Sequence, residues 1–121
     1  MTKILIIDDD NLLRNLFTKR LEHVGYEVAT ASDGEVGLEV AAEFLPDVIL
    51  LDYQMPKLNG DEVMGILSET DWGADIPIIV MSAISTLADI TNLDHAKLIM
   101  YKPITNRELL EAIEVVLESI A

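Results

Sequence analysis

Val48-Ile49-Leu50-Leu51-Asp52 is a run of four apolar residues that ends in a carboxylate. Two other apolar runs end in a similar way, since residues 4–7 lead into three consecutive aspartates and residues 98–101 lead into Lys102. If these runs are parallel strands of one sheet, their carboxyl ends lie along the same edge. Carboxylates and one ammonium group would then meet at one spot, which suits a hard divalent cation and a phosphoryl group.

The rest of the chain alternates between strand-like and helix-like segments. Apolar, β-branched runs predict strands, and amphipathic segments with apolar residues three or four apart predict helices. Asp10 or Asn11 is expected to cap the first helix, and Gly25 to end it. This alternation predicts an α/β fold with a parallel sheet and right-handed crossovers. The predicted strands are 3–7, 26–30, 47–51, 76–81 and 98–101, and the helices after the first are 35–44, 61–69, about 86–93 and 106–119.

The composition narrows the class of protein. The 121 residues, half of them hydrophobic, are enough for one domain with one core. Eight basic against 22 acidic residues give a net charge of −14, which argues against direct binding of nucleic acid or anionic lipid. There are no cysteines, so disulfides and thiolate chemistry are excluded. Because neither a signal peptide nor a membrane-spanning run is present, we expect a cytoplasmic location.

Asp52 is the candidate phosphoacceptor. It ends the predicted central strand and is followed by the turn formers Pro56 and Asn59-Gly60 rather than directly by a helix. Its carboxylate should therefore be accessible, and a carboxylate can accept a phosphoryl group to give an acyl phosphate. The alternative is that Asp52 only caps a helix or forms a turn.

The neighbouring acids suggest a site for Mg²⁺, which prefers oxygen ligands in an octahedral shell. We expect Asp9, Asp52 and the backbone carbonyl of Gln54 to bind the ion directly, and Asp8 to bind through water. The alternative is that the run Asp8-Asp9-Asp10 only caps the first helix and complements its dipole, which suits Asp10 best.

Lys102 and Ser82 complete the candidate site. The Lys102 ammonium group can pair with Asp52 and later with a phosphoryl oxygen, and the bond from Lys102 to Pro103 is a candidate for the cis form. The Ser82 hydroxyl can donate to a phosphoryl oxygen, and the small Ala83 beside it leaves room for a phosphodonor. The alternatives are a surface lysine and an ordinary turn serine.

In combination and in this order, these motifs resemble the receiver domain of response regulators in two-component signalling. The resemblance covers residues 1–121 as a single domain. It implies a doubly wound, five-stranded parallel sheet of the flavodoxin-like (receiver) type, with strand order 2-1-3-4-5. The motifs that carry it are Asp8-Asp9, Asp52 with Met55-Pro56 and Asn59-Gly60, Ser82-Ala83, and Lys102-Pro103.

The resemblance also implies a function and partners. A sensor histidine kinase or a histidine phosphotransfer protein would donate a phosphoryl group to Asp52 in a Mg²⁺-dependent reaction. The chain would not be an enzyme for a separate substrate, because it would catalyse only its own phosphorylation and dephosphorylation. Its output would pass through protein contacts, either to a downstream protein or to an effector domain of a longer protein from which this chain is excised.

Two departures from the family pattern bear on the output. Ile99 stands where many receivers have an aromatic residue that moves on activation, and the segment from 87 to 97 is the least typical part of the chain. Apart from these departures, Arg14, Lys19 and Arg20 form a basic cluster. This cluster could meet an acidic patch on a kinase or be an ordinary solvated helix face.

Two rival functions remain open from the sequence. A Mg²⁺-dependent phosphohydrolase with an aspartate nucleophile usually has a second aspartate two residues later, where this chain has Gln54. A scaffold that keeps the receiver fold but not the switch is disfavoured by the intact Asp9, Asp52 and Lys102. Substitution of Asp52 by Asn separates a scaffold from a phosphorylation-dependent switch. A scaffold should keep its partner interaction, and a switch should lose its regulation.

Overall fold

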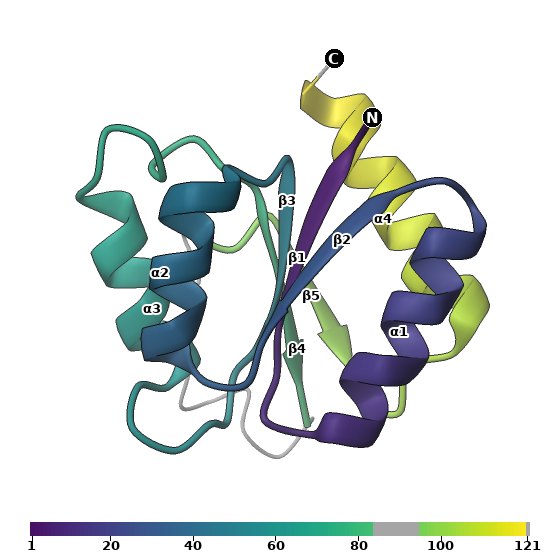
Figure 1. Ribbon diagram of the computed structural model, residues 1–121, viewed down its shortest axis with the longest axis horizontal. Helices are drawn as coiled ribbons and strands as arrows, with labels where there is room; N and C mark the ends of the chain where they lie inside the picture. Colours follow the sequence, from purple (N-terminus) through teal and green to yellow (C-terminus); the bar gives the residue numbers. More distant parts are fainter. Residues whose placement is uncertain (84–94, 121) are drawn as a thin grey trace.

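The computed structural model describes residues 1–83 and 95–120, which form a five-stranded sheet between two layers of helices (Figure 1). The predicted helix near 86–93 lies outside the described residues. Among the helices that are described, none is long and apolar enough to cross a bilayer. In chain order the elements are β1 (Lys3–Ile7), α1 (Asn11–His23), β2 (Glu27–Ala31), α2 (Gly34–Phe44), β3 (Val48–Asp52), α3 (Gly60–Ser68), β4 (Ile78–Ser82), β5 (Leu98–Tyr101) and α4 (Asn106–Ile120).

The sheet confirms the expected fold class. Its strand order is β2-β1-β3-β4-β5, and every neighbouring pair is parallel. In the register, Ile7 lies beside Leu51, and Asp52 lies beside Met81. The carboxyl ends of β1, β3 and β4 therefore sit side by side, at the lower edge of the sheet in Figure 1.

Among the described helices, α1 and α4 cover one face of the sheet, and α2 and α3 cover the other (Figure 1). Alternate residues of a strand point to opposite faces, so Ile4 and Ile6 pack in the cluster beneath α1 and α4. Leu5 and Ile7 pack in the other cluster, beneath α2 and α3. The strands β1, β3 and β4 are buried on both faces, which explains why they read as continuous apolar runs rather than as an alternating pattern.

Three strands begin and end later than predicted: β2 and β3 are displaced by one residue at each end, and β4 starts two residues late and ends one residue late. The starts of β2 and β4 have identifiable reasons. β2 begins at Glu27 rather than at Tyr26, because the Tyr26 N–H donates to the Leu21 carbonyl and belongs to the turn that ends α1. That turn uses Gly25 at φ +100°, a conformation that a residue with a side chain rarely adopts. β4 begins at Ile78 rather than at residue 76, because Pro77 has no N–H to give to a strand ladder.

Candidate functional site

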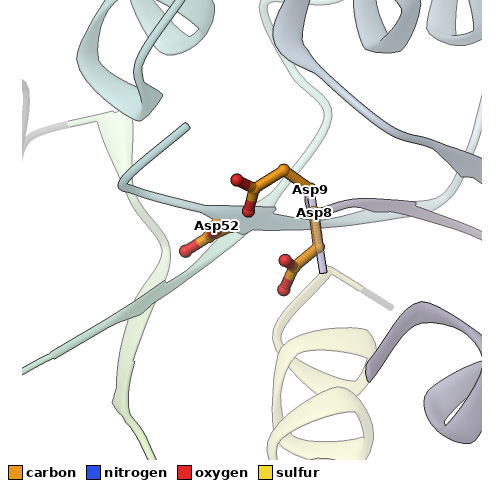
Figure 2. Close-up of side chains that lie close together, drawn as sticks. All are labelled: Asp8, Asp9 and Asp52. Carbon is orange, nitrogen blue, oxygen red and sulfur yellow. The ribbon is translucent and has the colours of Figure 1, made fainter. Parts of the chain in front are cut away.

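Three carboxylates meet where β1 and β3 end (Figure 2). Asp52 is the last residue of β3, while Asp8 and Asp9 follow β1, which is its neighbour in the sheet. One oxygen from each of the three side chains lies within 4.8 Å of the others. The structure thus brings together the three acids that the sequence placed at strand ends.

The three consecutive aspartates have separate environments. Asp8 is fully buried, Asp9 is exposed within the cluster, and Asp10 caps α1 by accepting from the Leu13 N–H at 3.1 Å. Asp8 Oδ1 accepts from the Asp10 N–H at 2.9 Å. Asp8 Oδ2 is buried and has no hydrogen-bond partner among the described residues. A buried carboxylate oxygen in this state is available to a cation or to a water that a cation holds.

Lys102 supplies the positive charge at the site. Its Nζ lies 3.1 Å from Asp52 Oδ1 and 3.6 Å from Asp8 Oδ2. The Lys102 N–H donates to the Ser82 carbonyl at 2.9 Å, which joins the ends of β4 and β5. The peptide bond from Lys102 to Pro103 is cis, the form for which the sequence made it a candidate.

Burial and charge shift the titration of this cluster. Burial, and then the nearby Asp8 carboxylate, raise the pKa of Asp52 from 3.8 to about 7, although Lys102 opposes the change. Burial also raises the pKa of Asp8. For Lys102, burial acts to lower the pKa, but Asp52 and Asp8 together raise it above its ordinary value. At neutral pH the Asp52 carboxyl group is therefore close to its pKa.

The donor set fits a hard divalent cation. All three groups are carboxylates, and one of their oxygens is buried without a hydrogen bond. Mg²⁺ takes oxygen ligands of this kind and keeps several waters. Gln54, whose carbonyl was predicted as a further ligand, lies at the start of the loop that leads from β3 to α3.

Ser82 and Tyr101, the last residues of β4 and β5, lie at the same edge of the sheet. Ser82 is the buried last residue of β4 and pairs with Tyr101 in the register. Its hydroxyl donates to the Ala83 carbonyl at 2.9 Å. Ile99 packs against the core on the α3 side, whereas Tyr101, which regular alternation directs to the same face, is 40% exposed.

Sequence reasoning missed two polar anchors beside the site. The Tyr53 hydroxyl donates to Asp61 Oδ2 at 2.8 Å, and both residues are buried. The Arg14 guanidinium donates to the Asp8 carbonyl at 2.7 Å and so holds the turn that carries the acids. The only signal for the first anchor was an aromatic residue directly after Asp52 and an acid in the first turn of the next helix.

Comparisons with known proteins agree with this arrangement. The family model of the response regulator receiver domain matches residues 4–114. Among curated proteins, the chain is 41% identical over 117 residues to "Probable transcriptional regulator ycf27" of Guillardia theta, covering 95% of this chain and 45% of that protein. It is 39% identical over 89 residues to the DNA-binding dual master transcriptional regulator RpaA of Synechocystis, covering 74% of this chain and 37% of that protein. The chain thus spans less than half the length of these relatives.

Solved structures show the same fold over nearly the whole chain. The chemotaxis response regulator CheY4 of Vibrio cholerae matches with a TM-score of 0.88 and 29% identity, covering 96% of this chain and 98% of that one. A response regulator receiver domain protein from Clostridium thermocellum matches with a TM-score of 0.89 and 28% identity, covering 98% of this chain and 96% of that one.

Proposed function

Because this chain belongs to the response regulator receiver domain family of two-component systems, we propose that Asp52 is its phosphoacceptor. The observation that carries the proposal is the position of Asp52, which ends β3 with Lys102 Nζ at 3.1 Å and two further carboxylates within 4.8 Å. We take residues 1–121 as a single receiver domain. Its phosphodonor is a phosphohistidine of a sensor histidine kinase or of a histidine phosphotransfer protein.

The transfer uses one oxygen of Asp52 as the nucleophile. Oδ1 accepts the hydrogen bond from Lys102, whereas Oδ2 has no hydrogen bond within the described part of the chain. The Oδ2–P bond forms as the P–N bond of the phosphohistidine breaks, and the departing imidazole nitrogen keeps the bonding electron pair. Lys102 then pairs with a phosphoryl oxygen, and the Ser82 hydroxyl can turn from the Ala83 carbonyl to donate to another.

The acids of the cluster serve the transfer by holding Mg²⁺. Asp9, Asp52 and the backbone carbonyl of Gln54 would bind the ion directly, and the buried Asp8 would bind it through water. Bound Mg²⁺ would supply the positive charge that three carboxylates and an incoming phosphoryl group require. The same site would let water hydrolyse the acyl phosphate, so that the chain catalyses only its own phosphorylation and dephosphorylation.

The signal is then read by protein contacts. With a net charge of −14, this chain alone is poorly suited to touch nucleic acid directly. The longer relatives carry the names of transcriptional regulators, so an effector domain of a longer protein is one candidate target and a separate downstream protein is the other.

Intact mass spectrometry after incubation with acetyl phosphate tests the acceptor. A single labile phosphoryl adduct should form with Mg²⁺ and be absent in EDTA. It should also be absent in Asp52→Asn and present in Asp75→Asn, which removes an exposed carboxylate from a loop outside the site. An adduct on Asp52→Asn, or one that forms equally well in EDTA, would contradict the proposal.

A further inference from the structure

The loop between β3 and α3 is anchored at both ends by buried contacts to Tyr53. The Tyr53 hydroxyl donates to Asp61 Oδ2 across the base of the loop at 2.8 Å. Tyr53 is 6% exposed and Asp61 is 8% exposed, so the hydrogen bond is closed off from bulk water. The segment between them carries Gln54, whose carbonyl is the proposed backbone ligand.

The backbone of Tyr53 is held as firmly as its side chain. Its N–H donates to the Met81 carbonyl at 2.9 Å, and its carbonyl accepts from the Gly60 N–H at 2.8 Å. The loop therefore closes on the residue that directly follows Asp52. The approach is so tight that a Cβ at position 60 would lie 2.9 Å from the Tyr53 Cα.

Burial of Asp61 is not needed to begin α3. The helix already has a capping box, in which the Asn59 side chain and Glu62 exchange hydrogen bonds with each other's backbone N–H. An acid in the first turn complements the helix dipole equally well when it is exposed to solvent. A buried carboxylate is unfavourable unless it is hydrogen-bonded, and a leucine could fill the same space without that requirement. The hydrogen bond from Tyr53 to Asp61 is directional, so it fixes where the Tyr53 hydroxyl lies.

We propose that the Tyr53–Asp61 hydrogen bond is a positioning element that holds the start of this loop for metal binding. It rests on the proposed function, because it assumes that the Gln54 carbonyl is a ligand of Mg²⁺. Tyr53 and Asp61 do not bind the ion themselves. They restrict the backbone next to Asp52, and so less conformational entropy is lost when Mg²⁺ binds.

Calorimetric titration of Mg²⁺ into the metal-free protein tests this positioning role. Tyr53→Phe, which keeps the ring and removes the hydroxyl, should weaken Mg²⁺ binding about tenfold. Asp61→Leu should weaken it to a similar extent. Asp61→Asn keeps an acceptor oxygen and should stay within about threefold of wild type. Tyr26→Phe is the matched control, because Tyr26 precedes β2 at the opposite edge of the sheet, and it should leave the affinity unchanged.

Each outcome discriminates between positioning and a merely structural role. A structural pair would lower the free energy of unfolding in Tyr53→Phe while leaving the Mg²⁺ affinity within about twofold of wild type, and this result would overturn the proposal. Equal weakening by Asp61→Asn and Asp61→Leu would also overturn it, since the charge rather than the hydrogen bond would then matter. If wild type itself binds no Mg²⁺ and forms no phosphoryl adduct with acetyl phosphate, the proposed function is wrong, and this result is distinct from a failure of the positioning role. Should Tyr53→Phe not fold, the comparison of the two Asp61 variants still decides.

Discussion

Substitution of Asp8 by Asn should stabilise the metal-free protein, although it removes a residue of the proposed site. Asp8 is fully buried, and burial is the main reason that its pKa is raised. A raised pKa means that the ionised carboxylate is disfavoured in the folded state relative to the unfolded chain. The substitution therefore removes an unfavourable charge and keeps Oδ1 as an acceptor for the Asp10 N–H.

The attractive and repulsive energies between Asp8 and the neighbouring charges nearly cancel. Burial of the Asp8 charge therefore decides whether Asp8→Asn stabilises or destabilises the fold. At an effective dielectric constant of 20, repulsion between carboxylates no more than 4.8 Å apart is at least about 3.5 kcal/mol. Attraction between Asp8 and Lys102 at 3.6 Å is about 4.6 kcal/mol on the same basis. Repulsion from Asp9 adds to that from Asp52, although the solvent around the exposed Asp9 screens it. The remaining effect is the burial of the charge, and its removal should stabilise the fold by about 1–2 kcal/mol.

Thermal and chemical unfolding in EDTA at neutral pH measure this change. The midpoint of thermal unfolding should rise by roughly 3–10 °C in Asp8→Asn. Asp10→Asn is the matched control, because it removes the same charge from an exposed residue and asparagine caps helices as well as aspartate does. Addition of Mg²⁺ should reverse part of the difference. At ten times its dissociation constant the ion stabilises wild type by about 1.4 kcal/mol, and the variant, having lost a carboxylate, should gain less.

If Asp8→Asn were no more stable than Asp10→Asn in EDTA, burial of the Asp8 charge would not be the dominant effect. Such a result would mean that the Lys102 attraction outweighs the burial of the charge. An equal gain from Mg²⁺ in wild type and in Asp8→Asn would separately contradict the placement of Asp8 beside the ion.

Three further predictions follow from the same contacts. Because the pKa of Asp52 is raised from 3.8 to about 7, its protonation contributes stability that is fully present below pH 3.8 and is lost as the pH rises through about 7. The free energy of unfolding, measured in metal-free buffer between pH 4 and 8, should show this decline. Asp52→Asn should flatten the pH dependence. Lys102→Gln should lower the free energy of unfolding at neutral pH by about 1–2 kcal/mol, after allowance for the partial exposure of Lys102. Substitution of the exposed Lys97 by Gln should have little effect in the same urea titration. Equal losses in the two variants would contradict the pairing of Lys102 with Asp52. Gly60→Ala should destabilise the fold by about 1–3 kcal/mol, because its Cβ would press on the Tyr53 backbone, and an unchanged urea midpoint would show that the loop yields freely.

The sequence predicted which side chains lie close together at the strand ends better than it predicted the boundaries of the elements. Asp52, Asp9 and Lys102 were placed together by one rule, that the carboxyl ends of parallel strands share an edge. The rule works here because β1, β3 and β4 are buried on both faces and so read as unmistakable apolar runs. The start of β2 was wrong by one residue, since the hydrogen bond from Tyr26 to Leu21 depends on how α1 ends and not on local periodicity.

The buried polar anchors could not be predicted from patterns. Tyr53 and Asp61 are eight residues apart, on either side of a loop whose path is set by contacts with Gly60 and with β4. Neither residue belongs to a periodic face, and each would be ordinary on a surface. Their pairing becomes visible only when the loop closes.

Local sequence patterns were enough to predict the alternation of strands and helices and the acidic and basic residues at the strand ends. These follow from local periodicity and from residue types, which act over a few neighbouring positions. The resemblance to receiver domains supplied the strand order, which periodicity does not contain. The sequence also made Asp10 a candidate cap of the first helix, and the structure confirms it. Tertiary structure alone decided that Asp8 is buried and that Asp9 is exposed. It also raised the pKa of Asp52, because burial and the distances between charges depend on segments that are far apart in the chain.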